Sequence, residues 1–273
     1  MLKTALKYFF FSLTLAVSIF SARTLAGDAR GEVIAVDGSV HVIDAAGDRR
    51  PVQQPGFLLR EADTIITDEG ANAVVRFDDG ALSVLDEKSR LRIEKTRWLS
   101  HLGGKIYFTF RKFFNGKRQV RTRFATLGIR GTTFIVYDDD RGQGVALQEG
   151  LLDIESSGPV FEIYRQRELD EFEAFKKQVQ QEQEELRDEF DEFKMQLSRE
   201  YIEYRESFAL NPGHVVRFVG ARVDESRIDD DIKADFESFE AIAGELLEEF
   251  RARSQRQKEM IEQEQSLDDE DFE

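Results

Sequence analysis

Short apolar runs recur about every ten residues through the first half of the chain, and turn-forming residues separate them. The clearest pair, residues 31–36 and 39–43, flanks an Asp-Gly dipeptide, which is typical of tight hairpin turns. Residues 78–80 separate another such pair. Runs of this length and spacing predict an antiparallel β sandwich or roll over residues 27–164.

A further hairpin is predicted over residues 105–124, and its pairing depends on the length of its loop. A two-residue loop would set Phe108 opposite Arg123 and mix aromatic with basic residues on one face. A three-residue loop, residues 115–117, would set Phe108 opposite Phe124 and keep the aromatic residues together. We therefore expect the three-residue loop, with a bulge.

The pattern changes near residue 164. Residues 165–207 contain no Gly or Pro, and their apolar residues follow one another at steps of mostly three and four. This predicts a long acidic amphipathic helix, or a helical hairpin whose apex is the stretch 180–185, which lacks apolar residues. A continuous helix of this length would span about 60 Å. Because Phe is frequent on the stripe, antiparallel helix packing, or packing of the helix on the β-domain, is favoured over a parallel dimeric coiled coil.

The rest of the chain alternates between the two patterns. Residues 215–219 predict a strand, residues 228–265 predict a second amphipathic helix, and residues 266–273 form an acidic tail expected to be disordered. The predicted fold class is therefore α+β: a mainly β N-terminal domain at 27–164, with residues 207–222 as a candidate closing element, and a long α-helical C-terminal part.

The N-terminal residues have the features of a secretory signal peptide. Lys3 and Lys7 precede an apolar run at residues 8–20, and small residues end the segment at Ala26. The run is shorter than the ~18 residues that a membrane-spanning helix needs. We expect cleavage after Ala26, a periplasmic or extracellular location, and no membrane span in the mature chain. An uncleaved N-terminal anchor is the alternative.

Composition excludes several kinds of site. The chain has no cysteine and three widely separated histidines, so disulfides and Cys- or His-based metal centres are not expected. Acidic and small residues at 138–142 resemble a calcium loop only in part, and a polar turn is favoured. The formal net charge of −16 lies mostly after residue 164, which argues against a nucleic-acid partner. No catalytic motif is present, so we expect no enzyme activity and no cofactor.

One stretch of the acidic chain is basic. Residues 105–123 contain seven basic residues and no acid. One interpretation is a patch that binds an anionic ligand. The other is a sheet face that is solvated or covered by the protein's own acidic helices, and we favour this second interpretation. The candidate patch comprises Lys105, Arg111, Lys112, Lys117, Arg118, Arg121 and Arg123.

Four blocks of residues carry a resemblance to a known family. Residues 31–42 have the form Gly-x-Val followed by Val-x-Gly and Val-x-Val, and residues 77–80 have the form Phe-x-Asp-Gly. Residues 128–136 read Gly-Ile-Arg-Gly-Thr-Thr-Phe-Ile-Val, and residues 149–154 begin with Glu-Gly. In these blocks the chain resembles the FecR domain family, although Ala62 and Thr122-Arg123 stand where that family usually has Gly and Thr-Pro.

The resemblance implies a β-domain without catalytic residues. Its most specific block supplies five positions, for which we expect a structural role: Gly128, Arg130, Gly131, Thr132 and Phe134. The founding members of the family are envelope regulators that receive a signal from an outer-membrane transporter. This chain lacks their cytoplasmic segment, so we do not expect it to act directly on a sigma factor. The resemblance then implies that the β-domain is an interaction module of the envelope.

The predicted function is that of a non-enzymatic envelope protein. Its FecR-type domain would act as a protein-interaction or scaffolding module, accessory to envelope signalling, and its helices would bind a protein partner or a second copy. The alternative is a carbohydrate- or peptidoglycan-binding module. In that case Trp98, with Arg97 and His101, would form a stacking platform.

Overall fold

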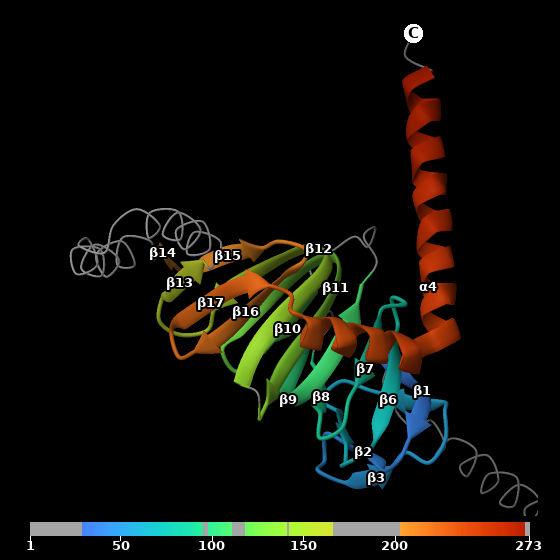
Figure 1. Cartoon of the computed structure of the whole chain (residues 1–273). Helices are drawn as coiled ribbons and strands as arrows, with labels where there is room; N and C mark the ends of the chain where they lie inside the picture. The colour runs from blue at the N-terminus through green and yellow to red at the C-terminus, as the bar shows by residue number, and fades with distance from the viewer. Residues whose placement is uncertain (1–28, 95–97, 111–117, 141, 166–202, 271–273) are drawn as a thin grey trace, which may run out of the picture.

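The computed structural model describes residues 29–94, 98–110, 118–140, 142–165 and 203–270, and these residues are mostly strand. The strands are β1 (Gly31–Asp37), β2 (Val40–Ile43), β3 (Arg49–Pro51), β4 (Phe57–Leu59), β5 (Thr64–Thr67), β6 (Asn72–Phe77), β7 (Leu82–Leu85), β8 (Arg90–Ile93), β9 (Trp98–Thr109), β10 (Arg118–Arg121), β11 (Ala125–Asp139), β12 (Gly142–Ser156), β13 (Phe161–Arg165), β14 (Glu203–Arg205), β15 (Ser207–Leu210), β16 (His214–Val219) and β17 (Arg222–Arg227). One helix, α4 (Asp230–Glu270), follows them (Figure 1).

Three long strands, β9, β11 and β12, take part in both layers of the β-structure. The second half of β9 pairs with β7 and β11, whereas its first half pairs with β8 and β10. Likewise, the first half of β12 pairs with β16 and its second half with β15. We call the layer that contains β1, β6, β7, β16, β17, β13 and β14 the helix-side layer. The layer that contains β3, β2, β5, β8, β10 and β15 is the open layer.

Glycines mark the places where the long strands cross between layers. Gly104 in β9, Gly131 in β11 and Gly150 in β12 have φ angles of 80°, 60° and 90°, which favour glycine over other residues. The β11–β12 register shifts between Arg130 and Thr133, as in a β-bulge. A Cβ atom at Gly150 would collide with the carbonyl oxygen of Gly131. The two strands can therefore bend together only with glycine at this position.

The main core lies between the two layers and is built from alternate residues of each strand. At its centre the ring of Phe134 stacks on Phe108 and Phe110, with centroid distances of 5.2 and 6.0 Å. Such offset stacking adds to the free energy of burying the rings. Because the layers share three strands, this one core spans nearly the whole length of the β-structure.

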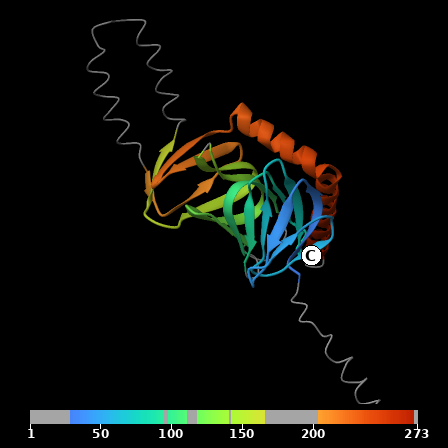
Figure 2. The same ribbon diagram turned by 90° about the horizontal axis from the view of Figure 1, so that it is seen from below.

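The first half of α4 covers the outer face of the helix-side layer (Figures 1 and 2). Asp229 caps the helix, since its Oδ1 accepts a hydrogen bond from the amide of Ile232 at 2.9 Å. Phe236 and Phe239 then pack on the ring of Tyr107, with centroid distances of 6.1 and 5.9 Å. This second apolar cluster explains why consecutive residues of β9 and β11 are buried, although their side chains point to opposite faces of the sheet. One face packs against the core and the other packs against α4.

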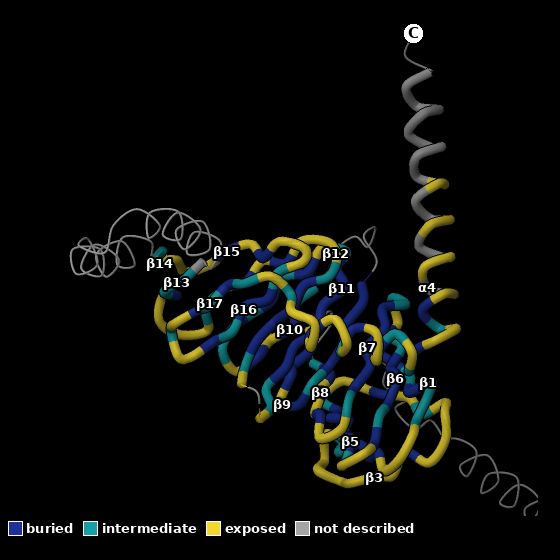
Figure 3. The backbone as a smooth tube through the Cα atoms, viewed as in Figure 1, coloured by how far each residue is buried: buried dark blue, intermediate teal, exposed yellow. Residues whose placement is uncertain are grey.

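At Gly244 the helix changes direction. Its backbone angles there, φ 39° and ψ −120°, are not helical. Leu247, just beyond the break, is still buried, but every described side chain from Arg251 to Met260 is exposed (Figure 3). Residues 245–270 therefore form an arm that leads away from the β-structure (Figure 1).

The predicted fold class is wrong in its second half. The C-terminal part is not a long α-helical part: residues 203–227 form four more strands, and a single helix, broken at Gly244, follows them. The strand expected at 215–219 is confirmed as β16, which pairs with β12. Its apolar residues alternate between the core and α4, so the sheet recruits it. The β-rich structure fits a sandwich.

The helix or helical hairpin expected at 165–207 falls mostly on residues 166–202, which lie outside the described residues. The strands on either side of that segment are described. β13 and β14 pair antiparallel, with Ile163 opposite Glu203. The chain therefore leaves and re-enters the sheet at neighbouring positions.

The hairpin predicted over residues 105–124 is also wrong. Phe108 lies opposite Phe134 of β11, and not opposite Phe124. β10 runs parallel to the first half of β9, with Gln119 opposite Trp98. The prediction paired residues 105–109 with the segment that follows them in sequence, whereas these residues pair with β11 and β10 pairs with the first half of β9. The expected loop at 115–117 lies outside the described residues.

We expect Gly150→Ala to lower the free energy of unfolding by about 3 kcal/mol or more, because it adds both an unfavourable φ and a collision at the bend. Urea denaturation followed by circular dichroism would measure the loss. Gly128→Ala in β11 is the control, since a Cβ there would meet Asp153 at an ordinary 3.5 Å. Equal stability of the two variants would contradict the role assigned to the bend.

Candidate functional site

The five motif positions lie together on β11, on both sides of its bend. Phe134 is in the centre of the core, and Thr132 is buried, with its carbonyl oxygen accepting a hydrogen bond from the amide of Phe110 at 2.9 Å. Gly131 supplies the left-handed backbone conformation. Gly128 and Arg130 face outward from the open layer, where Arg130 is exposed opposite Leu151. The motif thus builds the bend and places one cation on an outer surface.

Lys105, the first residue of the candidate basic patch, connects the sheet to α4. Its Nζ lies 3.1 Å from a carboxylate oxygen of Asp86 and 2.6 Å from one of Asp235. The same ammonium lies 5.6 Å from the centroid of the Phe239 ring. These largely buried charges fix the docked half of the helix at one point along β9.

Arg118 joins β10 to the turn between β6 and β7. Its guanidinium pairs with Asp79 and lies 3.5 Å from Asp78, and it also covers the rings of Phe77 and Phe110. Burial raises the pKa of Asp79 above its usual value, and the charge of Arg118 opposes that rise. The Phe-x-Asp-Gly turn is therefore held by an ion pair at the edge of the core.

The other described basic residues lie elsewhere. Arg121 stacks over the ring of Trp98 on the open layer, 4.9 Å from its centroid. Arg123 lies 3.3 Å from Asp138. The remaining members of the candidate patch, Arg111, Lys112 and Lys117, lie outside the described residues. The structure thus disperses the described members over separate contacts, and each of the four faces an acid or an aromatic ring.

The stacking platform expected around Trp98 does not include His101. Trp98 is 36% exposed on the outside of the open layer, whereas His101 is buried inside it. The Nε2 of His101 lies 3.0 Å from the carbonyl oxygen of Gly104, at the bend of β9. Burial lowers the pKa of His101 to about 4. Arg97, the third expected member, lies outside the described residues.

The turn at 138–142 forms a polar connection between β11 and β12. Asp138 accepts a hydrogen bond from the side-chain amide of Gln143 at 3.1 Å and lies near Arg123. Among the residues that the structure describes, no group of three or more His, Asp or Glu could hold a metal ion.

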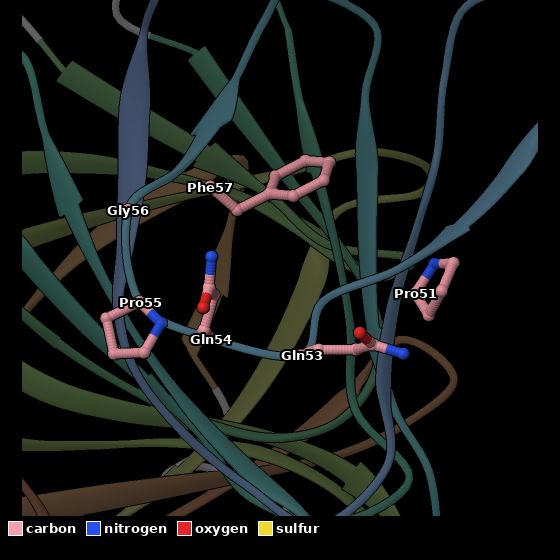
Figure 4. Close-up of a pocket in the computed structure, with 6 residues that line it drawn as sticks. All are labelled: Pro51, Gln53, Gln54, Pro55, Gly56 and Phe57. Carbon is pink, nitrogen blue, oxygen red and sulfur yellow. The ribbon is translucent and has the colours of Figure 1, made fainter.

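An open pocket lies in the loop between β3 and β4 (Figure 4). Two proline rings, two glutamine amides and one phenyl ring line it, so the pocket contains no ionisable side chain. Such a lining can make hydrogen bonds and apolar contacts but supplies no acid–base pair. The lining residues are Pro51, Gln53, Gln54, Pro55, Gly56 and Phe57.

The arm of α4 is exposed at most of its described positions. Leu246 and Leu247 hold its base against the second apolar cluster, and Arg251 reaches back across the break to Glu240 at 2.8 Å. Farther along, Met260 is 61% exposed. Sequence analysis expected a helix here but missed the break. The available signal was Gly244, a lone glycine within a helical pattern.

No helix among the described residues is both long enough and apolar enough to cross a lipid bilayer.

The buried His101 makes stability depend on pH. Because its pKa of about 4 in the folded protein lies below the ordinary 6.5, the unfolded chain takes up a proton first as the pH falls. Stability should therefore drop from about pH 6.5 down to about pH 4, by about 3 kcal/mol at most. Urea denaturation across this range would measure the change in stability, and His101→Gln is expected to flatten its dependence on pH. A wild-type stability that does not change would contradict the prediction.

Comparison with known proteins gives one family match, which includes the motif blocks at residues 77–80 and 128–136 but not the block at residues 31–42. Residues 63–153 match the family model described as FecR protein. FecR proteins are envelope-associated, and the family is generally non-catalytic. No curated protein matches the chain.

Similarity to solved structures is low. A candidate anti-sigma factor from Parabacteroides distasonis ATCC 8503, with crystal structures at 1.65 and 2.50 Å resolution, shares 14% and 13% identity, with a TM-score of 0.40 in both. The matches cover 63% of this chain and 63% of that one, so this chain spans less than two thirds of its length. A cell surface anchoring domain shares 26% identity over 25% of this chain and 88% of its own, with a TM-score of 0.24. At these values the structural matches carry no inference. The motif blocks at residues 77–80 and 128–136, together with the bend at Gly131 and Gly150, lie within residues 63–153, the stretch of this chain that the FecR family model matches.

Proposed function

We propose that this protein is a non-enzymatic envelope protein in which the FecR domain and its added strands present a helical arm to a protein partner. The observation that supports the proposal most directly is the division of α4 at Gly244. One half is packed on the sheet, and the other half, residues 245–270, leads away from it.

The docked half fixes where the arm begins. Ile232, Phe236 and Phe239 bury their side chains against the helix-side layer, and Asp235 pairs with Lys105. Burial of each large aromatic side chain contributes about 2 kcal/mol. These contacts make the first half of α4 part of the domain, so the direction of the arm depends on the break at Gly244.

The exposed half has little to stabilise it on its own. A single helix of this length is marginal in water, because its stability normally comes from packing one face against a neighbour. The described side chains from Arg251 to Met260 all face solvent. A protein partner would supply the missing neighbour, which is why we assign the interaction role to the arm.

Export of the chain is part of the proposal. The basic residues, apolar run and small residues of the first 26 positions support cleavage after Ala26 and a periplasmic or extracellular location. Intact-mass measurement of the protein purified from its own cells should give the mass of residues 27–273. A mass that includes residues 1–26 would favour the uncleaved anchor instead.

In-cell photo-crosslinking tests the role of the arm. A photoreactive residue placed at Gln255 or Met260, both exposed on the arm, should yield crosslinked adducts to protein. The same residue placed at Arg60 or Glu61, exposed on the β-structure, should not yield those adducts. Adducts to another protein or to a second copy both support the proposal, and the absence of arm-specific adducts would refute it.

To remove the arm alone, the chain should be shortened by a stop after Glu249. A much earlier stop, for example near Ser157 at the end of β12, would also remove strands of the β-structure. A chain ending at Ser157 would lose β15 and β16, which pair with β12 along the core. Its misfolding could then be mistaken for loss of a binding site. A stop after Glu249 keeps Leu246 and Leu247, the last residues of α4 shown in contact with the β-structure.

A further inference from the structure

We infer that the arm of α4 pairs with the arm of a second copy of this chain, antiparallel and centred near Met260. The inference rests on the proposed function and specifies its partner. It follows from the placement of the arm and from the order of charges along it.

From Arg251 onward, the charges on the arm fall into two blocks of opposite sign. The first block has only basic charges, at Arg251, Arg253, Arg256 and Lys258. The second block has only acidic ones, at Glu259, Glu262, Glu264, Asp268, Asp269 and Glu270. A parallel pair in register would oppose like charges over the whole length. An antiparallel pair opposes each block with the other, which selects this orientation and penalises the parallel one.

A pair centred on Met260 also brings individual residues of opposite charge to matching positions in the two copies. In this register Arg256 lies at the same level along the pair as Glu264 of the second copy, and each of these positions is about one helical turn from Met260. Met260 meets its own equivalent at the centre. Leu267 follows Met260 by seven residues, the spacing at which two positions of a helix recur on one face.

The end of the helix supplies a separate argument. The last turn of α4 contains no basic residue, although cations are the residues that stabilise the negative end of the helix dipole. Asp268, Asp269 and Glu270 add further negative charge there. In the antiparallel pair the basic block of the second copy lies beside this end and offsets the repulsion.

The geometry leaves room for the second copy. Beyond Leu247 the arm is about 35 Å long at ~1.5 Å per residue, and it projects from the β-structure (Figure 1). Two antiparallel arms of this kind place the two β-structures at opposite ends of the pair. The contact is small and largely polar, so the dimer should be weak and should dissociate as salt screens the charges.

A charge exchange on the mature full-length chain tests the inference. Analytical ultracentrifugation at about 5 to 100 µM should show a monomer–dimer equilibrium, weakened at least about tenfold between 50 and 500 mM salt. Arg256→Glu alone and Glu264→Arg alone should each be monomeric, because each creates two like-charge contacts across the pair. An equal mixture of the two variants should dimerise again, because both contacts become attractive.

The control is Arg130→Glu, the same change at an exposed arginine of the open layer, which should dimerise as the unchanged chain does. Far-ultraviolet circular dichroism would verify that the variants keep their fold. A chain that stays monomeric up to 100 µM, or a dimer that ignores both arm substitutions, would overturn the inference. If arm crosslinks to another protein persist in either case, the proposed function still stands; if arm crosslinks are absent as well, both fail.

Discussion

The bend at Gly131 and Gly150 is the constraint on which the rest of the structure depends. Three long strands can serve both layers only if each turns sharply near its middle, and the close approach of β11 and β12 there leaves no room for a Cβ atom at Gly150. The shared strands enclose one core, centred on Phe134. The motif at residues 128–136, the most specific part of the FecR resemblance, therefore largely encodes this bend in the strands.

Sharing strands between layers leaves one outer surface apolar. Tyr107 and Ile135 face outward from the helix-side layer and need cover, and the first half of α4 provides it. Phe236 and Phe239 pack on the ring of Tyr107, while the ion pair between Lys105 and Asp235 fixes the position of the helix along the sheet. The arm begins where this cover ends, so its placement is a consequence of how the sheet is built.

The charges of the protein fall into two classes that composition does not separate. Basic residues of the β-structure are engaged locally: Arg118 holds a turn, Lys105 holds the helix, and Arg121 covers Trp98. On the arm, by contrast, basic and acidic residues are sorted into blocks along an exposed helix. The locally engaged charges stabilise the fold, whereas the charges of the arm are the ones to which we assign recognition in the proposed function.

The sequence by itself determined the strands with clear alternation, the Asp-Gly turns, the strand at 215–219 and the FecR motif, because each of these depends on local periodicity or on a backbone angle that only glycine adopts readily. It could not determine that Phe108 pairs with Phe134, that His101 faces the core, or that the strands of residues 203–227 complete the sheet. Those features depend on which strands are neighbours. Only the tertiary structure decides that, because pairing across a long sequence separation is selected by the burial of both partners together.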